Sequence, residues 1–90
     1  MGEAAPQGGG VPGATLLGEL VRGGAHWDVY LETAPAEDGP LVRGRLHFAQ
    51  AERRRASAWI FLERSEREVA ARVGEFSSIE LWALLESLAP

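Results

Sequence analysis

Apolar and polar side chains alternate along two segments of this chain, at 26–33 and 41–48. Trp27, Val29 and Leu31 share one face of the first segment, and Leu46 and Phe48 share one face of the second. A period of two is the pattern of a strand with one buried face. Two β-strands are therefore predicted, and a further strand is expected just before them, at 15–22.

Gly23-Gly24 separates segments 15–22 and 26–33 and predicts a two-residue hairpin turn, because both central residues of such a turn adopt positive φ. The turn sets Leu20 opposite Trp27. Pairing the next two strands so that Leu31 faces Val42 sets Trp27 opposite Leu46. One apolar face then extends across three strands without conflict, which favours an antiparallel meander. The same register sets Asp28 opposite Arg45, Tyr30 opposite Arg43 and His26 opposite His47 on the other face, and it places Glu19 beside Asp28.

A fourth strand is predicted at 56–63, after a charged loop at 50–55. Its centre, Ala58-Trp59-Ile60-Phe61-Leu62, is apolar on both faces. Whichever face joins the core, two large side chains point the other way, and full burial of each contributes roughly 1.5–3 kcal/mol. Either a helix or a second subunit is expected to cover them.

Two helix starts follow the fourth strand. Ser65 to Glu68 and Ser77 to Glu80 both fit a capping box, in which the serine hydroxyl accepts from a backbone N–H and the glutamate reaches back. The apolar stripe of the second helix, from Ile79 to Leu88, is wider than one packing face needs. The predicted fold class is α+β: a four-stranded antiparallel meander followed by one kinked or two short C-terminal helices packed on the sheet.

Residues 1–13 are mostly Gly, Ala and Pro and, apart from Met1, hold one bulky apolar side chain, Val11. Such a stretch buries too little apolar area to offset its ordering entropy, so a disordered tail (1–13) and a single domain (14–90) are predicted. The chain has no Cys, which excludes disulfides and thiol nucleophiles. Without a signal-peptide pattern or a membrane-length apolar run, a cytoplasmic location is expected.

The chain carries 13 acidic and nine basic residues, a net charge of −4, which disfavours nucleic acid as a partner. An alternative surface is nevertheless predicted, where aromatic rings stack on bases and arginines contact phosphates. This predicted nucleic-acid face consists of Tyr30, Arg43, Arg45, His47, Arg53, Arg54 and Arg55. Binding there is expected to be weak and to fall steeply with salt.

Chemistry-bearing patterns are sparse. Two histidines, His26 and His47, lie near Asp28 in the assumed register and offer zinc ligands, but the pattern favours ordinary surface histidines, so no metal or cofactor is predicted. Ser57, His47 and Asp28 are the residue types of a catalytic triad, but sets of these three types occur on any protein surface, so no triad is predicted. No enzyme is predicted.

The sequence therefore predicts a non-enzymatic protein-interaction module, a homodimer or a binder of another protein, that uses strand four and the C-terminal helix as contact surfaces. The predicted partner-binding residues are Trp59, Phe61, Trp82 and Leu85. Weak binding of single-stranded nucleic acid is the alternative, and no membrane association is expected.

Overall fold

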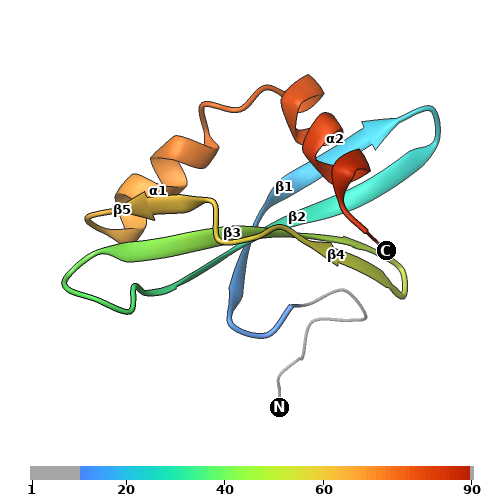
Figure 1. Cartoon of the computed structure of the whole chain (residues 1–90). Coiled ribbons are helices and arrows are strands. Elements are labelled where there is room, and N and C mark those ends of the chain that lie inside the picture. The colour runs from blue at the N-terminus through green and yellow to red at the C-terminus, as the bar shows by residue number, and fades with distance from the viewer. Residues whose placement is uncertain (1–10, 90) are drawn as a thin grey trace, which may run out of the picture.

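The computed structural model describes residues 11–89 and has the predicted α+β class. An antiparallel sheet is built from β1 (Ala14–Arg22), β2 (Ala25–Pro35), β3 (Val42–Gln50), β4 (Arg53–Ala56) and β5 (Phe61–Glu63). Two helices follow, α1 (Glu66–Val73) and α2 (Ser78–Ser87). Figure 1 shows both helices on one side of the twisted sheet, which we call the inner face; the opposite side is the outer face.

The first hairpin is confirmed. Gly23 and Gly24 have φ of +57° and +87°, and Leu20 lies opposite Trp27. The predicted register holds as far as Gly18, where a β-bulge begins. Leu17 is the extra residue, so Leu16 lies opposite Tyr30 on the outer face instead of opposite Leu31 on the inner face.

The predicted register between β2 and β3 is wrong by four residues. Leu31 lies opposite Leu46, not Val42, because β2 continues to Pro35 and a short turn joins the strands, with the Ala36 N–H donating to the Leu41 carbonyl at 2.8 Å. The shift is even, so every side chain keeps its predicted face. The outer-face neighbours change: Tyr30 lies opposite His47 and Glu32 opposite Arg45.

The predicted fourth strand is two strands that both pair with β3. The first of these, β4, lies mostly in the segment 50–55 predicted as a charged loop, because Ala51 adopts a φ of +52° and closes a tight turn. Between β4 and β5 the chain leaves regular pairing at Ser57. The Ser57 hydroxyl accepts from the buried Leu46 N–H at 3.0 Å and donates to the Ala58 carbonyl at 2.7 Å. This side chain replaces a missing backbone acceptor beside β3.

Both predicted helix starts are confirmed. The Ser65 hydroxyl accepts from the Glu68 N–H, and Ser77 and Glu80 form a complete capping box. Gly74 ends α1. Each helix places two buried side chains on the sheet, Val69 and Val73 from α1 and Trp82 and Leu85 from α2.

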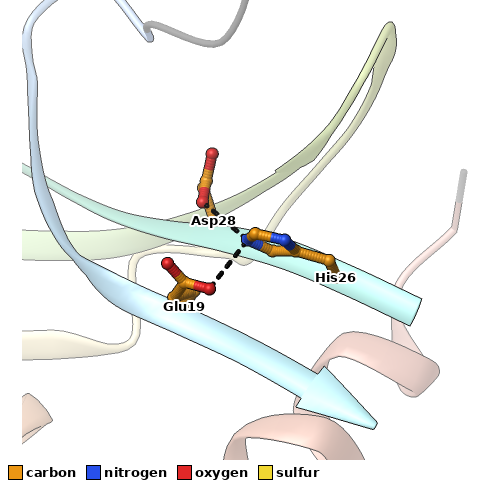
Figure 2. A group of neighbouring side chains, drawn as sticks. All are labelled: Glu19, His26 and Asp28. Atoms are coloured by element: carbon orange, nitrogen blue, oxygen red, sulfur yellow. Dashed lines mark ion pairs between the residues drawn. The ribbon is translucent and has the colours of Figure 1, made fainter. Parts of the chain in front are cut away.

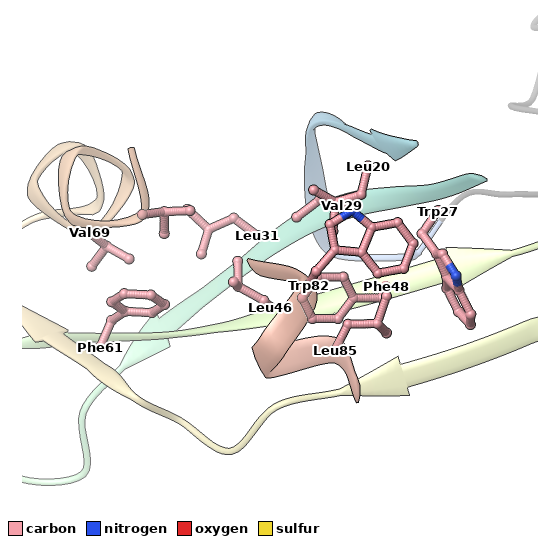
Figure 3. Close-up of a cluster of buried hydrophobic side chains, with 11 residues drawn as sticks. Leu20, Trp27, Val29, Leu31, Leu46, Phe48, Phe61, Val69, Trp82 and Leu85 are labelled. Carbon is pink, nitrogen blue, oxygen red and sulfur yellow. The ribbon is translucent and has the colours of Figure 1, made fainter. Parts of the chain in front are cut away.

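The core fills the space between the inner face and the helices (Figure 3). Phe48, Leu46, Leu85 and Val69 are its largest fully buried side chains. A second, smaller cluster lies on the outer face, where Val11 packs with Tyr30, Ala49 and Ala14. Of the predicted tail, residues 1–10 lie outside the described residues, and Val11 is buried.

Candidate functional site

Three of the four predicted partner-binding residues belong to the protein's own core. Phe61, Trp82 and Leu85 are 7%, 8% and 1% exposed. Phe61 meets Phe76 edge-on, at 5.8 Å between ring centroids. Trp59 is half-buried and faces the outer side, because the irregular segment after Ser57 turns Trp59 and Phe61 to opposite faces. The apolar side chains available to a partner are therefore different ones.

Within residues 11–89, exposed large apolar side chains occur in three places. Ile60 precedes β5 and Leu62 lies in it, where the sequence predicted uncovered apolar side chains, and they are 47% and 56% exposed. Ile79 begins α2. The other three lie on β1: Leu16 at 56%, Leu17 at 41% and Val21 at 63% exposed. No feature of the hydrophobic pattern singled out β1, because its edge position depends on the strand order.

The two edges of the sheet differ. One edge is formed by β4 and β5, which are four and three residues long and are separated by a break between Ala56 and Phe61. Three of the four residues of β4 are arginines, and Arg64 follows β5. The other edge is β1, which has nine residues, no Pro, no Lys and two charged side chains, Glu19 and Arg22. Short, broken and charged edges prevent strand addition, whereas a long apolar edge permits it.

A groove runs beside β1 on the inner side. Its volume is about 320 Å³, and it opens between the strand and the two helices. Apolar side chains make up most of its lining, which includes Leu17, Leu20, Val29, Val73, Phe76 and Leu81. Among residues 11–89 no strand pairs with the outer edge of β1, and this edge borders an apolar surface large enough for the side chain of an added strand.

The predicted nucleic-acid face is only partly assembled. Arg43 and Arg45 lie on the outer face, and their guanidinium carbons stand 4.2 and 4.4 Å from the centroid of the Trp59 ring. Tyr30, placed opposite Arg43 in the predicted register, is instead covered by Val11. Arg43 and Arg45 therefore engage the half-buried ring of Trp59.

Glu32 binds two side chains of this face, His47 and Arg45. Its Oε1 accepts from Nε2 of His47 at 2.7 Å and from Nε of Arg45 at 2.8 Å. The hydrogen bond from His47 and, to a smaller extent, the one from Arg45 lower the pKa of the Glu32 carboxyl below its ordinary value. The predicted pairing of Arg45 with Asp28 is wrong, because the four-residue register shift brings Glu32 to Arg45 instead.

The arginine run is divided between the two faces of β4. Arg53 and Arg55 lie on the inner side, each 5.3 Å from the centroid of Trp27, and Arg55 also donates to the Leu85 carbonyl at 3.3 Å near the end of α2. Arg54 lies opposite Ala49 and points to the outer side. Alternation along a strand separates the three cations, so they form no continuous basic surface.

The two histidines lie in different clusters. His47 is bonded to Glu32, and His26 meets Glu19 and Asp28 (Figure 2). The predicted group of His26, His47 and Asp28 is therefore not formed. Glu19 takes the place of His47. The signal for it was present in the sequence, because the first hairpin turn places Glu19 directly opposite Asp28.

The possible catalytic triad of Ser57, His47 and Asp28 is not assembled either. The Ser57 hydroxyl is buried and bonded to Leu46 and Ala58, while His47 Nε2 is bonded to Glu32. Among residues 11–89, no helix has the length and apolar character required to cross a bilayer.

Comparisons with protein-family models, with curated proteins and with solved structures found no match for this chain. A function for it must therefore be argued from the residues and their geometry.

Proposed function

We propose that this protein is a non-enzymatic interaction module that forms a homodimer through the free edge of β1. The supporting observation is the contrast between the two sheet edges: the edge of β4 and β5 is short, interrupted and charged, and the edge of β1 is nine residues long and mostly apolar, with one β-bulge at Leu17. Proteins that remain monomeric protect both edges of an open sheet.

The energy available at β1 matches a weak, concentration-dependent dimer. Leu16, Leu17 and Val21 are each roughly half exposed, so covering each contributes on the order of 1 kcal/mol. Each new backbone hydrogen bond adds about 0.5–1.5 kcal/mol net. Association costs about 4–15 kcal/mol, which two copies of the strand's side chains and several hydrogen bonds are able to offset.

A second copy suits this edge because antiparallel pairing of β1 with itself needs nothing but a two-fold axis. The same strand then supplies the donors, the acceptors and the apolar side chains on both sides, which is the arrangement of an isologous interface. A domain of this size also gains stability from self-association, since it buries a smaller fraction of its unfolded surface than a larger domain does.

The contact surface proposed here differs from the one that the sequence favoured. Phe61 of β5 and Trp82 and Leu85 of α2 belong to the core. Ile60 and Leu62 are therefore the exposed large apolar side chains of the segment predicted as the fourth strand. These two residues lie on the broken edge and serve as matched controls for those on β1.

Mass measured by light scattering during size-exclusion chromatography, over a range of loading concentrations, tests the proposal on the full chain. The wild type is expected to move from monomer to dimer as concentration rises. Leu16→Lys and Val21→Lys are expected to remain monomeric, because a lysine on an edge strand opposes pairing. Leu62→Lys, equally exposed on the opposite edge, is expected to dimerise as the wild type does.

Far-UV circular dichroism of each variant verifies that the fold is retained. A wild type that stays monomeric at every concentration refutes the proposal. Loss of the dimer in Leu62→Lys but not in Val21→Lys also refutes it, and would place the dimer contact at β5.

A further inference from the structure

Three metal-ligating side chains converge on the outer face of the first hairpin. The Nε2 atom of His26 lies 3.0 Å from Oε1 of Glu19 and 3.4 Å from Oδ1 of Asp28. One donor atom from each residue lies within 4.8 Å of the other two. Figure 2 shows both carboxylates directed at the same edge of the imidazole ring, Glu19 from β1 and His26 and Asp28 from β2.

The backbone holds these side chains in place. Gly23 and Gly24 fix the hairpin register, and Glu19 lies directly opposite Asp28. His26 is two residues before Asp28 on the same strand and therefore shares its face. Two carboxylates on directly opposed positions repel each other, and a cation between them removes that repulsion.

The separations suit a small divalent cation. Bonds of about 2.0–2.1 Å to nitrogen and oxygen in a tetrahedral zinc site place neighbouring ligand atoms about 3.3 Å apart. The two separations from His26 Nε2 are 3.0 and 3.4 Å, close to this spacing, and the two carboxylate oxygens lie within 4.8 Å of each other. The imidazole nitrogen selects a transition-type cation over Mg²⁺ or Ca²⁺, which prefer oxygen ligands alone.

We infer that Glu19, His26 and Asp28 form a site for a divalent transition cation of the Zn²⁺ type. His26 binds through Nε2 and keeps its ring proton on Nδ1. Glu19 and Asp28 supply one oxygen each and neutralise the cation, and water completes the coordination. All three side chains are accessible to solvent, with side-chain exposures of 55%, 56% and 38% for His26, Glu19 and Asp28, so a free cation reaches the site directly.

The chain contains two histidines, which makes the test specific. Zn²⁺ is titrated into the full-length apoprotein while the imidazole resonances of both histidines are followed by NMR, and isothermal titration calorimetry gives the stoichiometry. One Zn²⁺ per chain is expected, with shifts at His26 and none at His47. His26→Gln is expected to weaken binding at least about tenfold, the smallest loss seen when supporting groups of metal sites are removed.

Glu19→Gln and Asp28→Asn are expected to weaken binding in the same way, and His47→Gln is expected to leave it unchanged. Retained affinity in His26→Gln, shifts centred on His47, or no saturable binding by the wild type each overturns the inference. None of these outcomes affects the dimer proposal, which depends on Leu16 and Val21.

Discussion

Gly44 permits α1 to approach the sheet, and its substitution tests the packing in Figure 3. A methyl group at this position of β3 would lie 2.5 Å from Cγ1 of Val69 and 3.5 Å from Cδ1 of Leu31. Carbon atoms pack favourably at about 3.5–4.0 Å, so the first contact is an overlap of about 1 Å. Val69 cannot rotate away easily, because it is fully buried and a β-branched residue in a helix has one favoured χ1 rotamer.

The expected cost of Gly44→Ala follows from two opposing effects. Overpacking a core costs about 1–3 kcal/mol. Replacing Gly with Ala returns up to about 1 kcal/mol through the unfolded chain. A net destabilisation of about 1–2 kcal/mol is therefore expected, and in a domain of this size each kcal/mol lowers Tm by about 4–8 °C.

Equilibrium urea unfolding of four proteins measures this effect: wild type, Gly44→Ala, Val69→Ala and the double variant. In the Val69→Ala background the overlap is absent, and Gly44→Ala is expected to be neutral or slightly stabilising. Gly18→Ala is the control, because its added methyl meets no atom within 4 Å. Additive free energies in the double-mutant cycle, or a Gly44→Ala protein as stable as Gly18→Ala, would refute the reasoning.

Two further predictions concern single side chains. Ser57→Ala leaves the buried Leu46 N–H without its acceptor and is expected to lower the free energy of unfolding in urea by about 1–3 kcal/mol. The control, Ser78→Ala on the exposed first turn of α2, is expected to change it by less than about 0.5 kcal/mol. Equal effects of the two substitutions would contradict the role given to Ser57. Glu32 has a lowered pKa in the folded state, so its contribution to stability is present above its ordinary pKa of 4.5 and is lost as pH falls below that value. Glu32→Gln is expected to lose less stability than the wild type between pH 7 and pH 3, measured by the same method, and an identical loss in both proteins would count against this assignment.

Features set by local chemistry were predictable from the sequence. Positive φ at Gly23 and Gly24 fixes the first hairpin, and the register beside that turn is as expected. Ser65 and Ser77 begin the two helices because a capping serine acts on backbone groups within three residues. The hydrophobic alternation also determined which side chains face the core, and this result survived the register error because a shift of four residues changes no face.

Features that depend on contacts distant in the sequence were not predictable. The sequence does not show that β2 continues to Pro35 before the turn that joins it to β3, so the pairing of Leu31 with Leu46 was not predicted. The turn at Ala51 has no sequence signal, since its positive φ is imposed on a residue that rarely adopts it. The segment predicted as the fourth strand is divided between β4 and β5, because the Ser57 hydroxyl accepts a hydrogen bond from the Leu46 N–H, eleven residues earlier.

The candidate sites show the same division. The Gly23-Gly24 turn, which is recognisable in the sequence, places Glu19 beside Asp28. His47 lies near Glu32 and not near His26, because the register between β2 and β3 differs from the predicted one. Trp59, Phe61, Trp82 and Leu85 were correctly recognised as large apolar side chains, but hydrophobicity alone does not distinguish core from contact surface. The strand order and helix placement decide that question, because they put three of these residues inside and leave the edge of β1 unpaired within the part of the chain that the structure describes.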